Sequence, residues 1–261
     1  MIKSLLKQKK LILVLITLIF LLITSFFYEN KVSYIHFVDE EDNMITGKYL
    51  LRGDKIYSDI FEQHQPISYI ASAAVQKVTK PSSIFLLIKR HREFVILWSI
   101  LWSVFLVYRF GLLGLGFSGI FESTKIFLLG NLFLAESLIV YPLVYLVAFA
   151  LRKTKKLDSL DIFFLGLVFS FCTFLLAPAW PLITFLFLFL FIRDKLYKKW
   201  KMLLLGFMLV VLLILPFISV FPDYFRDIFL FNLKYYIPLE RNGLGFFSII
   251  KSFFSFLTVF I

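Results

Sequence analysis

The sequence predicts an all-α polytopic membrane protein with about seven to eight transmembrane helices. It also predicts an outer first loop that carries two amphipathic helices at the membrane interface. Hydrophobic residues make up 60% of the 261 residues, and the mean hydropathy is +0.88. Soluble domains are usually about 45–50% apolar. The excess lies in runs long enough to cross a bilayer, which takes roughly 20 residues per helix. We therefore expect residues 1–261 to form a single membrane domain.

Charge and cysteine content exclude several other classes. The net charge is +11, but the basic residues lie in short clusters between apolar runs. This pattern indicates membrane topology rather than nucleic-acid binding, so we expect the membrane as a partner and no nucleic acid. The single cysteine, Cys172, lies inside an apolar run and excludes an intrachain disulfide and a multi-cysteine metal site.

The N-terminus predicts the orientation of the chain. Four lysines among the first ten residues precede an apolar run, and no small-residue cleavage site follows it. This is typical of an uncleaved signal anchor, TM1 at about 10–28, with a cytoplasmic N-terminus. The basic clusters at the N-terminus, 152–156 and 193–201 then fall on one side. The polar loop at about 29–92 falls on the outer face of what we take to be the plasma (inner) membrane.

The remaining helices are expected at about 93–261. The individual spans are predicted at 93–108, 110–121, 126–150, 160–176, 182–192 and 202–220, with a last apolar run at 245–261. Because this last run is short for a span, we expect the natural chain to continue beyond it.

Two amphipathic stretches are predicted in the polar loop. The first is a helix beginning near Asp42, with one side formed by Met44, Ile45, Tyr49 and Leu50. The second follows the i, i+3, i+4, i+7 pattern of a helix face with Ile67, Ile70, Ala71, Ala74, Val75 and Val78. Helices of this kind tend to lie flat among lipid headgroups. Pro66 suits the start of the second helix, and Gly53-Asp54 the turn between them.

Four consecutive acids, Asp39, Glu40, Glu41 and Asp42, stand at the start of this loop. One interpretation is an N-cap with acids that favour the positive end of a helix dipole. Another is a divalent-cation site, since hard cations bind carboxylate oxygens; no other cofactor is indicated. A third is a general base that deprotonates a sugar acceptor. Inverting transfer needs such a base on the face opposite the leaving group.

Other polar residues are candidates for contacts with a lipid phosphate, which needs positive donors. On the outer side these are Arg52, Lys55, His64, Lys125, Arg226, Lys234 and Arg241. For most of them the alternative is a side chain that extends to the headgroups. His64 is either catalytic or structural. Glu136 is either a functional acid near the end of a span or a residue that reaches the interface.

The loop resembles a known family on a set of spaced residues: Asp39, Glu40, Gly53, Tyr57, Asp59, His64, Gln65 and Pro66. It is similar to the polyprenyl-phosphate-sugar-dependent membrane glycosyltransferases of the C-type fold, in particular the family 39-like group. That group includes protein O-mannosyltransferases and the lipid A aminoarabinose transferase. The segment 131–137 resembles the family's Glu-bearing segment. The resemblance covers roughly residues 10–200, and its most specific part is 39–66.

The resemblance implies inverting transfer of a sugar from a polyprenyl-phosphate donor to a lipid, glycan or protein acceptor. It implies Asp39 as the general base with Glu40 beside it. It also places His64 close to the donor or acceptor. We further select Arg52, Asp42, Tyr57, Asp59 and Glu136 as candidates for substrate binding. Glu41 and Asp42 depart from the family pattern by adding acids. The alternatives from other classes are a transporter or flippase, with ionisable residues along a path, and a non-catalytic assembly subunit.

Overall fold

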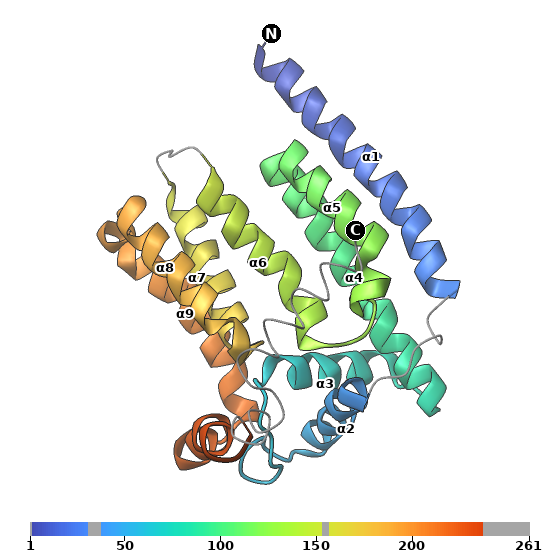
Figure 1. The fold of residues 1–261 in the computed structure, drawn as a ribbon, viewed down its shortest axis with the longest axis vertical. Coiled ribbons are helices and arrows are strands. Elements are labelled where there is room, and N and C mark those ends of the chain that lie inside the picture. The colour runs from blue at the N-terminus through green and yellow to red at the C-terminus, as the bar shows by residue number, and fades with distance from the viewer. Residues whose placement is uncertain (1, 31–37, 153–156, 237–261) are drawn as a thin grey trace, which may run out of the picture.

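The computed structural model describes residues 2–30, 38–152 and 157–236 (Figure 1). Within them, one group of helices lies side by side as a bundle. Its members are α1 (Ile2–Asn30), α4 (Ile84–Phe110), α5 (Leu112–Thr124), α6 (Ala135–Leu151), α7 (Ser159–Thr173), α8 (Trp180–Arg193) and α9 (Trp200–Ile214). Short 3₁₀ segments connect several of them, namely η1 (Lys125–Leu128), η2 (Ala177–Ala179), η3 (Leu196–Lys199) and η4 (Leu215–Phe217).

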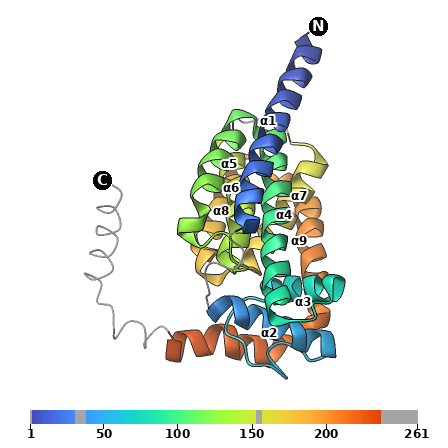
Figure 2. The same cartoon turned by 90° about the vertical axis from the view of Figure 1, so that its right-hand side faces the viewer.

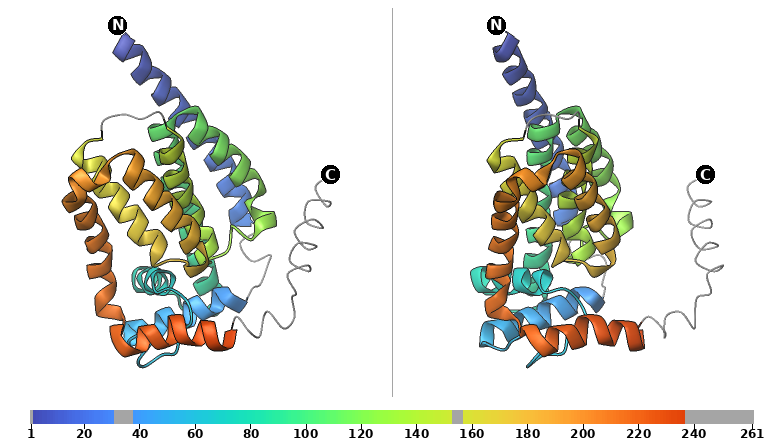
Figure 3. Two further views of the ribbon diagram at one scale, coloured as in Figure 1. Left: turned by 60° about the vertical axis from the view of Figure 1, so that its left-hand side comes forward. Right: turned by 90° about the vertical axis from the view of Figure 1, so that its left-hand side faces the viewer.

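A second group of helices lies across one end of the bundle, opposite the N-terminus of α1 (Figures 2 and 3). It consists of α2 (Val38–Arg52), α3 (Ile67–Thr79) and the π-helical segment η5 (Val220–Tyr236). We call this group the end layer. Because α1 leads into it and α4 leads out of it, the acids at the start of α2 lie directly at the end of the bundle.

Three helices are long and apolar enough to cross a membrane: Lys10–Asn30, Ile84–Phe110 and Leu196–Phe217. Three shorter helices, at 135–151, 159–173 and 177–193, are also apolar. The prediction of a helical protein is therefore confirmed, and the three helices are compatible with a membrane protein, whereas the count of seven to eight spans is not confirmed. The predicted apolar run at 245–261 lies outside the described residues.

Two predicted boundaries differ from the structure. Helix α4 begins at Ile84, after Ser83 caps it by accepting a hydrogen bond from the Leu86 N–H. The polar loop thus ends before residue 92, and His91 and Arg92 are buried in α4. The span predicted at 126–150 is interrupted, because η1 ends at a left-handed Leu129 and α6 starts only at Ala135.

The end layer follows the predicted turns, and the predicted apolar side of each helix is only partly buried. Gly53 has φ +101°, and α3 starts directly after Pro66, as expected. On α3, Ile67 and Val75 of the predicted apolar side are buried, whereas Ala74 and Val78 are exposed. The buried face also contains Ser68, Ser72 and Gln76. On α2, Met44 and Leu50 are buried, but Ile45 and Tyr49 are exposed. The physical reason is polar pairing: the Gln76 amide donates to the Met44 carbonyl at 2.7 Å.

Helices α7 and α9 approach closely at two glycines. A Cβ on Gly166 would overlap the carbonyl oxygen of Leu203, and one on Gly206 would overlap that of Phe163. Small residues let helix backbones pack closely in membranes. We expect Gly166→Ala to destabilise the protein by about 1–3 kcal/mol, a typical cost of overpacking.

A matched control for this variant is Gly116→Ala on α5, where an added Cβ meets nothing within 4 Å. That change should be neutral or stabilising by about 0.5–1 kcal/mol, because alanine is the better helix former. Thermal unfolding of the purified protein in detergent would compare the two. Equal effects would contradict a close crossing of α7 and α9.

Candidate functional site

Glu40 lies in a buried ion pair that joins three parts of the chain. Its side chain is 3% exposed. The Arg92 guanidinium on α4 donates to it from Nε at 3.0 Å and from Nη2 at 2.6 Å. The backbone N–H of Phe133, just before α6, donates to the same carboxylate at 2.9 Å. A buried carboxylate needs this degree of pairing. The arrangement suits a residue that fixes the start of α2 rather than one that contacts substrate.

Asp39, the neighbouring acid, is exposed at the first turn of α2. Its carboxylate has no hydrogen-bond or ion-pair partner among the residues that the structure describes. Its backbone carbonyl accepts a hydrogen bond from the Asn43 amide at 2.8 Å. The adjacent Glu40 is held by Arg92, so the backbone at the start of α2 is fixed. An exposed carboxylate on a fixed backbone is what a general base needs.

Glu62 was not among the residues selected from the sequence. It is 5% exposed and lies between α2 and α3, where Thr46 donates a hydrogen bond to Oε1 and Tyr69 donates to Oε2 at 2.5 Å. Burial raises the pKa of the Glu62 carboxyl to about 7, and the charges of Asp42 and Asp227 contribute to the rise. The hydrogen bonds from Thr46 and Tyr69 oppose it.

The Tyr69 hydroxyl also lies 3.2 Å from Asp42 Oδ2. A tyrosine hydroxyl has one hydrogen, so the two carboxylates share a single donor. When Glu62 is protonated, Tyr69 is free to donate to Asp42. When Glu62 is ionised, the Tyr69 hydroxyl donates to Glu62 instead. The predicted site residue Asp42 is half-buried. Because it shares the Tyr69 hydroxyl with Glu62, the hydrogen bonding of Asp42 depends on the protonation state of Glu62, whose pKa is about 7.

The predicted loop residues have different surroundings. Tyr57 is completely buried in a left-handed backbone conformation, and its hydroxyl donates to the His64 carbonyl at 2.9 Å. Asp59 accepts a hydrogen bond from the Lys55 N–H at 2.8 Å and so stabilises the turn. The His64 side chain is exposed, as is Arg52, which lies over the Tyr49 ring. Tyr57 and Asp59 therefore shape the loop, whereas His64 and Arg52 are accessible.

Segment η5 covers this loop from the other side. The Arg226 guanidinium donates to the Tyr57 carbonyl at 2.8 Å, and Tyr224 donates to the Gln65 Oε1 at 3.1 Å. Two buried atoms, Asp227 Oδ2 and Gln65 Nε2, have no hydrogen-bond partner among the described residues. Sequence reasoning missed Asp227, because nothing in its local sequence indicates that it folds back onto residue 57.

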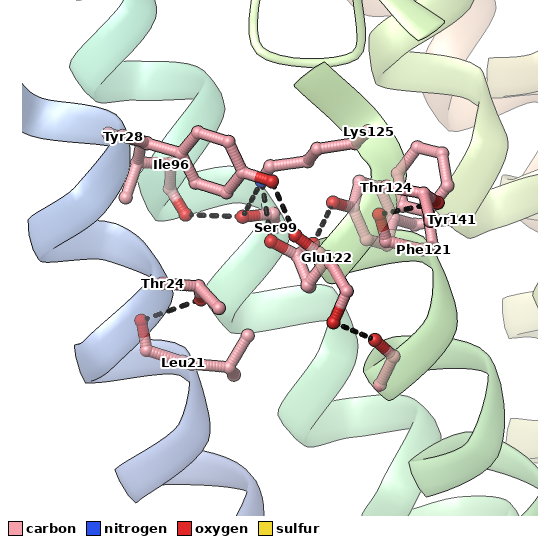
Figure 4. Close-up of polar contacts among 12 residues, drawn as sticks. Leu21, Thr24, Tyr28, Ile96, Ser99, Phe121, Glu122, Thr124, Lys125 and Tyr141 are labelled. Carbon is pink, nitrogen blue, oxygen red and sulfur yellow. Dashed lines mark hydrogen bonds and ion pairs between the residues drawn. The ribbon is translucent and has the colours of Figure 1, made fainter. Parts of the chain in front are cut away.

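Glu136, the last predicted site residue, is exposed in the first turn of α6, where an acid is favoured by the helix dipole. The buried acid of this region is Glu122 instead (Figure 4). It pairs with the Lys125 ammonium at 2.6 Å and accepts a hydrogen bond from Tyr141. The Tyr28 hydroxyl, in the last turn of α1, donates to the Glu122 carbonyl.

Lys125 also donates to the Ser99 hydroxyl of α4 at 3.1 Å (Figure 4). This cluster therefore ties α1 to α4, α5 and α6 close to the point where the chain leaves for α2. Lys125 is 1% exposed, so it is an internal structural cation and not one that reaches a phosphate at the surface.

Within the described part of the chain, no group of three or more His, Cys, Asp or Glu side chains is arranged to hold a metal ion. Comparisons with protein-family models, with curated proteins and with solved structures found no match to this chain.

Proposed function

We propose that the chain is a membrane glycosyltransferase that moves a sugar from a polyprenyl-phosphate donor to a lipid, glycan or protein acceptor. In this proposal, α1 enters from the cytoplasm and the end layer lies on the outer face of the membrane. Asp39 is the general base, and transfer proceeds with inversion. No metal is assigned a role.

The observation that carries the proposal is the contrast between two neighbouring acids at the end of the bundle. Glu40 is fixed by Arg92 and by the Phe133 N–H, whereas Asp39 is exposed and without a partner among the described residues. A lipid phosphate lies at the level of the headgroups, so its sugar projects just above them. A carboxylate at the start of a helix lying across the bundle end is at the right level to deprotonate the incoming hydroxyl or amine.

Sugar transfer also requires positive groups that stabilise the lipid phosphate as it leaves. The end layer has accessible basic side chains that can do this. Arg52, at the last turn of α2, and His64, before α3, are both exposed. We assign them to contacts with donor or acceptor. The alternative of a transporter is less well supported, because the carboxylate of the buried acid Glu122 is paired with Lys125 and Tyr141 inside the protein.

Asp39→Asn tests the proposal. The substitution keeps the size of the side chain but removes the base, and general-base catalysis typically contributes about 100-fold or more. We expect single-turnover transfer from a set of radiolabelled polyprenyl-phosphate sugars to fall by at least that factor. The matched control is Asp54→Asn, in the turn after α2, which should leave the rate unchanged.

Full transfer by Asp39→Asn would reject Asp39 as the base. Failure of the wild-type protein to use any donor in the set, together with Glu136-dependent movement of a solute across vesicles, would favour the transporter.

A further inference from the structure

Two buried hydroxyls of the α4–α5 hairpin, Ser103 Oγ and Ser118 Oγ, have no hydrogen-bond partner among the residues that the structure describes. Both side chains are 0% exposed. An unpaired hydroxyl in apolar surroundings is costly, because it has lost its hydrogen bonds to water and gained none in return. Ser103 lies in Ile84–Phe110, a helix apolar enough to cross a membrane, where bulk water offers no partner. One polar group placed between the two serines would remove this cost for both.

Ser103 lies on the side of α4 that faces α5, between two contacts with that helix. Four residues earlier, the Ser99 hydroxyl accepts a hydrogen bond from the Lys125 ammonium at 3.1 Å. Four residues later, the backbone nitrogen of Val107 lies 2.7 Å from the position that a Cβ on Gly114 would take. Residues four apart lie on the same side of a helix. The Ser103 hydroxyl therefore points into the α4–α5 interface.

Ser118 lies opposite Ser103 on α5. It comes four residues after Gly114, which touches α4, and four before Glu122, which pairs with Lys125 in the buried cluster (Figure 4). Because α4 and α5 are the two arms of a hairpin, one turn away from the contact at Gly114 leads to Ser103 on α4 and to Ser118 on α5. The two hydroxyls thus face one interface at the same level, yet they do not hydrogen-bond to each other. A water molecule commonly bridges polar groups at such a separation.

Thr24 on α1 supplies a third polar atom at this level. Tyr28, one turn later on α1, donates to the Glu122 carbonyl of α5. Since α1 and α5 both run toward the end layer, one turn back along each helix leads to Thr24 and Ser118 (Figures 1 and 4). The Thr24 hydroxyl donates to the Leu21 carbonyl at 3.1 Å, so its hydrogen is used but its oxygen can still accept.

We propose that the interface of α1, α4 and α5 is a binding site for one internal water molecule, held by Ser103, Ser118 and Thr24. The water accepts a hydrogen bond from each serine hydroxyl and donates one to Thr24 Oγ1. Buried waters typically make about three hydrogen bonds to groups that would otherwise be unpaired. This water extends the polar cluster around Glu122 and Lys125 by one helical turn into the bundle. It thereby joins α1 to the α4–α5 hairpin at a second level.

Hydroxyl-radical footprinting tests for the water directly, because radicals formed from a bound water by ionising radiation oxidise the side chains next to it. The reporter is Val107, which is 0% exposed and lies one turn from Ser103 on the same side of α4. The control is Val210 of α9, a buried valine away from this interface. The purified full chain is irradiated in detergent, and oxidation of each valine is measured by mass spectrometry. We expect Val107 to be oxidised several-fold faster than Val210, and the double variant Ser103→Ala, Ser118→Ala to lose this excess.

Thermal unfolding of the single variants gives a second measurement that does not depend on labelling. Ser103→Ala or Ser118→Ala alone leaves the water with one partner fewer, so each should lower the Tm by a few degrees. The double variant should recover part of this loss, and Ser123→Ala, at an exposed serine of α5, should change nothing. A dry interface predicts the opposite sign, because each alanine then removes an unpaired polar group. Equal oxidation of Val107 and Val210 in the wild type, oxidation of Val107 that persists in the double variant, or a higher Tm in both single variants would overturn the proposal.

Discussion

Arg92→Met is expected to lower the free energy of unfolding by about 3–5 kcal/mol, the cost of removing one partner from a buried ion pair. Methionine fills much of the space of the arginine stem but leaves Glu40 without its counter-ion. The Phe133 N–H would remain as a donor, which cannot compensate for the loss of a full charge. Denaturant or thermal unfolding of the protein in detergent would measure the change.

Two further variants distinguish the cost of leaving a buried charge unpaired from the cost of losing an ion pair at the surface. Lys89→Met breaks the pair with Glu29, in which both side chains are 40% exposed, and should have little effect. The double variant Arg92→Met, Glu40→Gln removes both charges and should recover much of the stability lost in Arg92→Met alone. If Arg92→Met were no more destabilising than Lys89→Met, the buried pair would not be what fixes the start of α2.

The sequence predicted the positions of the helices better than their faces. Apolar runs mark membrane-spanning lengths, and Gly53 and Pro66 mark turns through their own backbone preferences. On α3, Ile67 and Val75 of the apolar pattern are buried, but Val78 is exposed, and Ser72 and Gln76 are buried as well. A membrane reverses the usual rule, because apolar side chains can remain on the outside while polar ones need partners inside.

The division of roles within the acidic cluster could not be predicted either. Asp39 and Glu40 are adjacent and chemically similar, yet one is exposed and the other is bound to a residue 52 positions away. Periodicity and composition carry no information about such distant pairs. The same holds for Glu62, whose environment depends on Thr46, on Tyr69 and on the return of η5 with Asp227.

Glu62 should make the stability of the protein depend on pH in the direction opposite to that of most carboxylates. Its pKa is about 7 in the folded state against 4.5 for an ordinary glutamate, so the folded state holds its proton more tightly. Its contribution is therefore fully present below about pH 4.5 and is lost as the pH rises to about 7. One pKa unit corresponds to about 1.4 kcal/mol, which gives roughly 3 kcal/mol in total. Thermal unfolding in detergent at a series of pH values from 4.5 to 8 would show this decline.

Glu62→Gln tests the assignment, because glutamine resembles the protonated acid and does not titrate. We expect this variant to lose the decline between pH 4.5 and 7, although its single amide oxygen can accept only one of the two hydrogen bonds that Thr46 and Tyr69 donate to the carboxylate. Glu136→Gln, at an exposed acid on α6, is the matched control and should retain the wild-type decline. A wild-type profile that is flat over this range, or a decline that persists in Glu62→Gln, would show that Glu62 is ionised in the folded protein. In that case the Tyr69 hydroxyl would donate to Glu62 throughout the neutral pH range. The hydrogen bonding of Asp42 would then not change with pH through Glu62.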